Sequence, residues 1–400
     1  MKAKTTYYIN RSIMGLAFNM MFTATALYRI DIAKLEIYQL ILIGTAMELS
    51  IFLFEMPTGI VADLKSRKIS VITGIFIIGF ATVFEALTPY FFMIFIAQVL
   101  WGFGYTFISG ALQSWASDET HKKDLSHMLL TGSQLYTLMS IIGIVITAMI
   151  GTKDIKIALY VASIMMVVLG LTNIFFMKEE NFHKEPHDHH LFKAYMNQFK
   201  KGYQHIKSNQ VLKIMFVVML FFGLYSEGID RTYEIHILDH LDFRTLIDLP
   251  AIWILSIINA FIVLLGFILM QLIKKYVAKH KQIFGWLITF TMTMIIGVLC
   301  FGFLPNAYLA VLGFLIFHAA REASSPLLDT ILLSYTPSNI KATVLSTFGQ
   351  IDAIGQIISG LIMVAIGLTL DIKFIYLVTA LILVVPVISL IQLRFKKVKL

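Results

Sequence analysis

Long apolar runs recur along this chain, and each is followed by a polar segment. A run of about 20 residues can cross a hydrocarbon core of about 30 Å as a helix, because an α-helix rises about 1.5 Å per residue. Twelve runs of about this length occur, near residues 9–29, 38–61, 70–88, 91–114, 126–150, 157–177, 211–235, 247–273, 282–304, 308–332, 343–367 and 373–393. The pattern predicts an all-α polytopic membrane protein with twelve transmembrane helices.

A long polar stretch, Lys178 to Gln210, divides these runs into six and six. It predicts an N-terminal six-helix bundle over residues 1–178, a cytoplasmic linker over residues 179–210 and a C-terminal six-helix bundle over residues 211–400. Within the linker, aromatic residues recur at near-helical spacing between Lys193 and Lys207. This spacing predicts an amphipathic helix that lies along the inner membrane surface.

The distribution of lysine and arginine predicts the orientation of the chain. About 22 of these residues fall in segments on the side of the N-terminus, and six fall on the opposite side, namely Arg29, Lys34, Lys153, Lys156, Arg244 and Lys373. Basic loops remain preferentially in the cytoplasm. We therefore expect both termini to be cytoplasmic, in a protein of the plasma membrane.

Composition supports this class of protein. Of the 400 residues, 58% are hydrophobic and 14% are charged, and the mean hydropathy is +0.81, whereas soluble domains hold about 45–50% apolar and about 25% charged residues. A soluble globular protein is thereby excluded. The formal net charge of +8 is explained by the basic loops, so we expect the lipid bilayer, and no nucleic acid, as the partner of these cations.

A charged turn between the second and third runs carries a motif. Its residues read Gly59-x-x-x-Asp63-x-x-Ser66-Arg67-Lys68, which resembles the loop between the second and third helices of the major facilitator superfamily. Leu64, Ser66 and Ile69 depart from the family pattern, which has a basic residue, a glycine and a further basic residue there. The lead-in Glu55-Met56-Pro57-Thr58-Gly59 resembles that of drug-efflux-like members.

Two other segments extend the resemblance. Residues 226–236 are similar to a Ser-Glu-Gly-x-Asp-Arg block of exporter-like members, and Gln98-x-x-x-Gly102-x-Gly104 resembles a helix-four motif in which Gln98 replaces an arginine. The family resemblance implies two six-helix halves with a transport site between them near the bilayer midplane. It also implies that Gly59, Asp63, Arg67 and Lys68 form an inner gate, in which Asp63 engages the amino terminus of helix eleven near Lys341–Leu345.

Ionisable residues inside the apolar runs are candidates for proton coupling and substrate binding, because a charge in hydrocarbon is costly and faces the bundle interior or a cavity. They are Glu48, Glu55, Arg321, Glu322 and Asp352. Glu48, about 15 Å deep, is interpreted either as a carboxylate that gains and loses a proton or as a structural acid paired with a buried arginine such as Arg321. Asp352 has a cavity-facing role or a role in helix packing.

Adjacent residues on a helix point about 100° apart, so Arg321 and Glu322 are poor partners for each other. We expect each to find a partner elsewhere, with Asp352 the first candidate for Arg321. A second group, toward the external end of helix seven, comprises Glu227, Asp230, Arg231 and Glu234. Arg231 is spaced to serve both Glu227 and Glu234. Asp230 is left over, either to bind a cation or proton or to form part of an external gate.

The linker histidines are a third group of candidate site residues, in this case for binding a metal ion. His183, His187, His189 and His190 stand beside Glu185 and Asp188, a clustering that suits a divalent metal, although a solvated linker needs no ligand. We expect no metal and no cofactor. The chain has no G-x-x-x-x-G-K-[ST] nucleotide loop and no catalytic constellation, so we expect no enzyme activity.

We expect a secondary active transporter that works by alternating access, is coupled to protons, and exports an amphipathic or cationic small molecule as a monomer. Two alternatives stay open. One is a symporter or uniporter for a metabolite. The other is a protein that has lost transport and serves as a membrane sensor or assembly partner.

Overall fold

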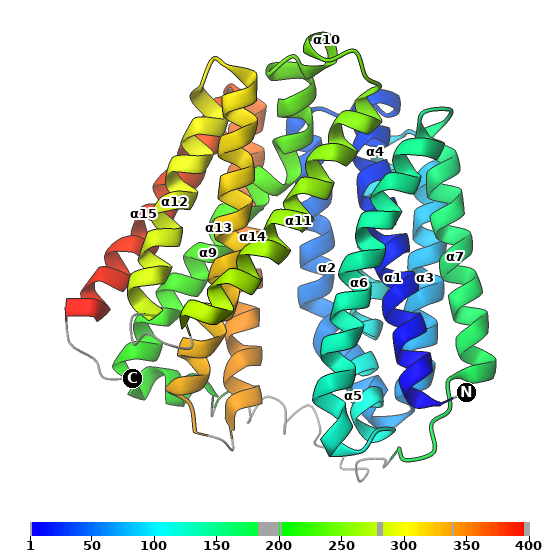
Figure 1. The fold of residues 1–400 in the computed structure, drawn as a ribbon. Coiled ribbons are helices and arrows are strands. Elements are labelled where there is room, and N and C mark those ends of the chain that lie inside the picture. The colour runs from blue at the N-terminus through cyan, green and yellow to red at the C-terminus, as the bar shows by residue number, and fades with distance from the viewer. Residues whose placement is uncertain (1, 183–199, 201, 278–282, 338–339, 396–400) are drawn as a thin grey trace. The chain divides into compact units, whose positions relative to one another are not determined.

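The computed structural model describes residues 2–182, 200, 202–277, 283–337 and 340–395, which form helices and no β-strand (Figure 1). The helices of the first part of the chain are α1 (Ala3–Leu27), α2 (Ile37–Leu64), α3 (Arg67–Leu87), α4 (Phe91–Ile108), α5 (Ala111–Asp118), α6 (Lys122–Gly151) and α7 (Ile155–Phe176). Those of the second part are α9 (Gln210–Ile235), α10 (Phe243–Leu246), α11 (Ala251–Val277), α12 (Ile283–Phe303), α13 (Ala307–Ser334), α14 (Lys341–Thr369) and α15 (Ile372–Phe395).

The all-α membrane class is confirmed. Within the described residues, eleven helical spans are long and apolar enough to cross a bilayer. They account for every predicted run except 308–332, which corresponds to α13, a helix of 28 residues that carries Arg321, Glu322 and Asp329. Twelve transmembrane helices are consistent with these eleven spans and α13.

Local sequence explains where the observed helices depart from the predicted limits. The fourth helix is interrupted at Ser109–Gly110 and resumes as α5. The eighth begins at Ala251, after Pro250, because proline lacks the N–H that a continuing helix needs and suits a helix start instead. Of the predicted linker helix Lys193–Lys207, residues 202–207 are helical, and residues 193–199 and 201 lie outside the described residues.

The chain divides into two compact units. Unit 1 comprises residues 1–36, 46–189 and 248–260, and unit 2 comprises residues 37–45, 190–247 and 261–400. In unit 1, α1 packs against α6 and α7, and α3 packs against α4 and α7 (Figure 1). In unit 2, α9 packs against α14 and α15, and α12 packs against α13 and α15. The predicted bundle limits stay a prediction.

Helices α1 and α9 end in the same way. A π-helical turn, Tyr28–Ile32, follows α1, and another, His236–His240, follows α9. After each turn a residue adopts a left-handed backbone, Lys34 with φ 52° and Asp242 with φ 56°. The same 208 residues separate the two turns and the two left-handed residues. The backbone thus shows an internal repeat with a spacing of 208 residues.

Glycine permits close helix crossings at related places in the two units. A Cβ at Gly15 of α1 would collide with the Tyr136 carbonyl of α6, and one at Gly223 of α9 would collide with the Asp352 carbonyl of α14. Small residues let membrane helices approach closely enough for backbone packing. These crossings place α6 beside α1 in unit 1 and α14 beside α9 in unit 2.

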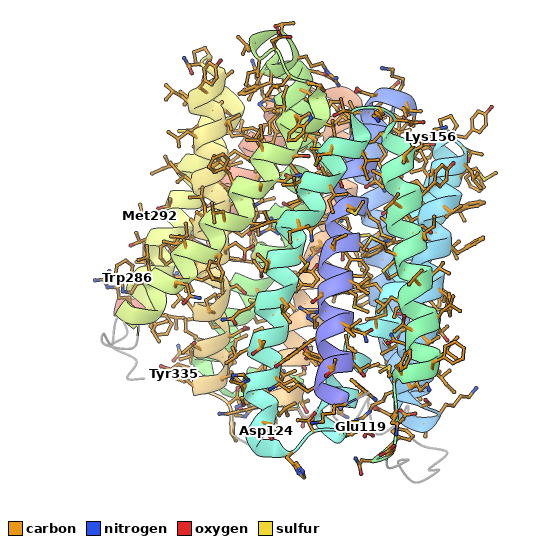
Figure 2. All side chains as sticks on the ribbon, turned by 45° about the vertical axis from the view of Figure 1, so that its right-hand side comes forward. Glu119, Asp124, Lys156, Trp286, Met292 and Tyr335 are labelled. Atoms are coloured by element: carbon orange, nitrogen blue, oxygen red, sulfur yellow. The ribbon has the colours of Figure 1, made fainter. Side chains whose placement is uncertain are left out.

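The side chains on the outer surface are those expected of helices in lipid. Trp286 and Met292 of α12 point outward from unit 2 (Figure 2), and their exposed fractions are 37% and 49%. In unit 1, Glu119 and Asp124 lie at one end of the bundle and Lys156 at the other (Figure 2). Charged residues therefore mark the two ends of unit 1, and apolar residues cover the faces between them.

Candidate functional site

Arg321 of α13 forms an ion pair with Asp230 of α9. Its Nη1 donates to Asp230 Oδ1 at 2.5 Å, and the guanidinium lies over the Tyr225 ring, 5.6 Å from its centroid. This corrects two expectations, that Asp352 would be the partner of Arg321 and that Asp230 would be left over. The expectations failed because spacing along one helix does not show which side chains of another helix face it.

Asp352 of α14 is held by its own helix. The Gln356 side chain, one turn further along, donates from Nε2 to Asp352 Oδ2 at 2.7 Å. Asp352 is half-buried, and its charge still acts on the buried hydroxyl of Tyr225, as do the charges of Arg321, Asp230 and Glu322. Four ionisable residues within the apolar helices of unit 2 therefore act on the same tyrosine.

Glu322 points away from Arg321, as its position on the helix predicts. Its side chain lies against Gly266 of α11, where an added Cβ would stand 3.0 Å from Glu322 Cγ. Arg321 faces α9 instead. The two neighbours thus contact different helices, and the expectation that they would not pair with each other is consistent with this geometry.

The predicted pairing of Glu227 with Arg231 is confirmed. Arg231 donates to Glu227 through Nε and Nη2, each at 3.2 Å, and the Glu227 side chain is 2% exposed. Glu234 is half-buried on the same helix and acts electrostatically on the hydroxyl of Tyr376. Its pairing with Arg231 stays a prediction, and so does the role of this group as an external gate.

Glu48 and Glu55 lie two turns apart on α2 and therefore share a face of the helix. Two side chains fasten this helix to α4, since Ser50 Oγ donates to the Val99 carbonyl at 2.8 Å and Thr58 Oγ1 donates to the Thr106 carbonyl at 3.1 Å. Glu48 is half-buried and Glu55 is exposed. The charges of both act on the hydroxyl of Tyr105 in α4.

Arg11 of α1 acts on the same tyrosine. Its guanidinium also lies over the ring of Tyr136 in α6, 4.5 Å from the centroid. Arg11 was not among the candidates singled out from the sequence. The signal was available, because an arginine eight residues into an apolar helix is as costly as the acids that were singled out.

A further buried group joins three segments of unit 1. Arg29 donates from Nε and Nη2 to the two carboxylate oxygens of Glu85, at 2.7 and 3.1 Å, and Gln98 Nε2 donates to Glu85 Oε2 at 2.7 Å. The Glu85 side chain is 1% exposed. Gln98, which stands where the family motif has arginine, thus meets an acid whose countercharge already comes from Arg29.

Two basic residues of the predicted inner-gate motif, Arg67 and Lys68, connect the start of α3 to α5 and to the C-terminal end of α7. Arg67 pairs with Asp118 at the end of α5, donates to the Ser114 carbonyl at 3.0 Å, and lies 3.6 Å from Asp63. Lys68 Nζ donates to the Ile174 carbonyl at 2.9 Å. The predicted engagement of Asp63 with the amino terminus of helix eleven stays a prediction.

One departure from the family motif, Ser66, has a local explanation, and one glycine of the motif, Gly59, is not required by local packing. Ser66 caps α3, since its Oγ accepts from the Ile69 N–H at 3.0 Å, and it also donates to Glu179. Its φ of −180° is extended backbone, so the turn does not require the glycine that the family has. At Gly59 an added Cβ would meet nothing within 4 Å, so packing within the described residues does not require that glycine.

The linker histidines and their neighbouring acids lie outside the described residues. Within the ranges that the structure does describe, no group of three or more His, Cys, Asp or Glu side chains is placed to hold a metal ion.

Comparison with known proteins agrees with the helical architecture. The profile of the Major Facilitator Superfamily matches residues 7–360. The chain is 22% identical over 403 residues to the uncharacterized MFS-type transporter YxaM of Bacillus subtilis (strain 168), a match that covers 96% of this chain and 94% of that protein.

Among solved structures, the chain resembles the nucleoside transporter NupG with a TM-score of 0.80 at 14% identity, over 98% of this chain and 99% of that one. It resembles a bacterial homolog of the human lysosomal transporter Spinster with a TM-score of 0.75 at 13% identity, over 98% and 97% of the two chains. At such identities the likeness shows the fold alone.

Proposed function

The chain belongs to the Major Facilitator Superfamily of membrane transporters, and we propose that it is a secondary active transporter that exports an amphipathic or cationic small molecule in exchange for protons. It works by alternating access as a monomer in the plasma membrane. The excess of lysine and arginine in the predicted inner segments supports cytoplasmic termini.

One observation carries the proposal, namely that the ion pair of Arg321 with Asp230 is partly exposed. The charges of both residues also act on Asp352. The two paired side chains are 29% and 28% exposed, although they lie within long apolar helices. Charges in contact with acyl chains would cost on the order of several kcal/mol each. This exposure supports a wet pathway to the ion pair, which is what a transport mechanism requires.

Asp352 is the better proton carrier of the two acids in this group. Its bonded neighbour Gln356 is neutral, and an amide can accept a hydrogen bond as well as donate one, so the contact survives protonation of the carboxyl. Asp230 instead faces a permanent cation, which favours its charged form. We assign proton movement to Asp352 and, in unit 1, to Glu48.

The polarity of the site supports a cationic or amphipathic substrate. Glu48 and Glu55 present two carboxylates on one face of α2, and the charges of both act on the hydroxyl of Tyr105; an aromatic ring with nearby acids attracts an organic cation. The residues from Glu55 to Gly59 and the segment 226–236 support the exporter-like branch. The nucleoside and Spinster-like transporters that share the fold do not specify a substrate for this chain.

The proposal is tested by measuring proton-gradient-dependent uptake of a fluorescent organic cation into inverted membrane vesicles. We expect uptake by the wild type, and a loss of at least tenfold in Glu48→Gln and Asp352→Asn. The matched control is Asp154→Asn, because Asp154 is exposed and caps α7, a task that asparagine performs equally well.

Gradient-independent uptake, or full activity in both the Glu48 and the Asp352 variants, would refute proton coupling through these residues. Membrane expression of each variant is compared with the wild type so that reduced uptake is not confused with reduced protein.

A further inference from the structure

A cavity opens within unit 1, between α1, α4, α5 and α6. Its volume is about 230 Å³. The polar part of its lining comprises one arginine and five neutral hydrogen-bonding residues, namely Arg11, Tyr7, Tyr105, Ser109, Gln113 and Tyr136. Part of the remaining lining is apolar and includes Met14, Phe18 and Leu112. The cavity is thus amphipathic, with one permanent charge.

Arg11 is the charge in this cavity, and one of its hydrogen-bond donors has no partner within the described residues. Its Nε is buried and has no hydrogen-bond partner among the described residues. The guanidinium lies over the ring of Tyr136, 4.5 Å from the centroid. A buried donor of this kind is costly when unpaired.

A glycine in the wall of the cavity leaves room for the side chain of Arg11. At Gly132 of α6 an added Cβ would stand 3.2 Å from Arg11 Cγ and would collide with the ring of Tyr7. The absence of a side chain there leaves room for both residues. Arg11 also acts electrostatically on the hydroxyls of Tyr7, Tyr105 and Tyr136, so donors and one cation converge on the same space.

We propose that this cavity binds the carboxylate end of a small amphipathic organic acid or zwitterion, with Arg11 as the anion-binding group. A planar guanidinium fork matches the two oxygens of a carboxylate, and the tyrosine hydroxyls supply further donors. Met14, Phe18 and Leu112 receive the apolar body. At about 230 Å³ the cavity is somewhat smaller than typical drug-sized sites of about 300–1,000 Å³, so it suits a small ligand or one end of a larger one.

This inference deepens the proposed function, on which it rests for the claim that the bound acid is transported. It narrows an amphipathic or cationic substrate to one that also carries an anionic group. The two acids of α2 and Arg11 all act on Tyr105, so a zwitterion would meet opposite charges at its two ends.

The test uses three probes with the same apolar body and different head groups: phenylbutyrate, the neutral phenylbutanamide and the cationic phenylbutylamine. Their dissociation constants are measured by calorimetry with the full chain in lipid nanodiscs, and empty nanodiscs provide the background. We expect wild-type protein to bind phenylbutyrate at least tenfold more tightly than phenylbutanamide.

Substitutions of Arg11 test whether this residue causes the preference for phenylbutyrate over phenylbutanamide. Arg11→Gln should reduce the ratio of the two constants to about one, and continued binding of phenylbutanamide shows that the variant is folded. Arg11→Lys keeps the charge and should retain a several-fold preference. The matched control, Lys213→Gln, removes a cation from an exposed position on α9 and should leave the wild-type ratio.

Equal binding of acid and amide by the wild type, a preference that survives Arg11→Gln, or no binding of any probe would overturn the inference. These outcomes are independent of the vesicle assay. If cation uptake persists while the carboxylate preference is absent, only this inference fails. If the preference is found while proton-dependent uptake is absent, only the proposed transport function fails.

Discussion

The ion pair of Arg29 with Glu85 offers a quantitative test of how unit 1 is held together. Arg29→Gln removes both charged hydrogen bonds to a carboxylate that is 1% exposed. One neutral donor, Gln98, is then left from the present set. Removing one partner of a buried pair costs about 3–5 kcal/mol, and the remaining amide contact places the expected loss near the lower end.

The reverse change is expected to cost less. In Glu85→Gln, Arg29 loses its counterion, but its side chain is 14% exposed and a long cationic side chain can extend toward water. We expect a loss of about 1.5–3 kcal/mol, as for a hydrogen bond to a charged group. The double variant contains no unpaired charge at this site and should resemble Glu85→Gln.

Unfolding free energies of the wild type, the two single variants and the double variant form a thermodynamic cycle. They are measured by denaturant titration of the purified protein in mixed micelles, with tryptophan fluorescence as the signal. The expected coupling energy between Arg29 and Glu85 is at least about 2 kcal/mol, well above the about 0.5 kcal/mol within which independent sites add. A coupling near zero would show that the pair does not stabilise unit 1.

Three further predictions follow from single contacts. Asp63→Asn is expected to lower transport while membrane expression stays intact, because a carboxylate favours a helix amino terminus; unchanged vesicle flux would contradict this. Asp230→Asn leaves the charge of Arg321 without its acid, and since both side chains are more than a quarter exposed the unfolding free energy should fall by about 1–2 kcal/mol, less than for a fully buried pair. Gly15→Ala introduces a Cβ against a backbone carbonyl, whereas Gly59→Ala meets open space. The yield of folded protein after size-exclusion chromatography should therefore fall in the first variant alone.

Much of the architecture was predictable from the order of residues. The predicted runs correspond to the observed helices within a few residues at most edges, because the length of an apolar run and the polar turn that follows it are local properties. The pairing of Glu227 with Arg231 was predictable for the same reason, since residues four apart on one helix are neighbours. The turn from Gly59 to Lys68 was sufficient to indicate the family.

Contacts between helices were not predictable in this way. Arg321 bonds Asp230 and not Asp352, Glu85 meets Arg29, and Arg11 opens onto a cavity. Each contact depends on which helices are adjacent and on how each is rotated about its axis, and hydropathy in a lipid environment constrains neither strongly. Close crossings at glycines and the interlocking of side chains set that rotation. For this reason the sequence alone determined where charges lie along the helices, and only the tertiary structure decided which of them meet.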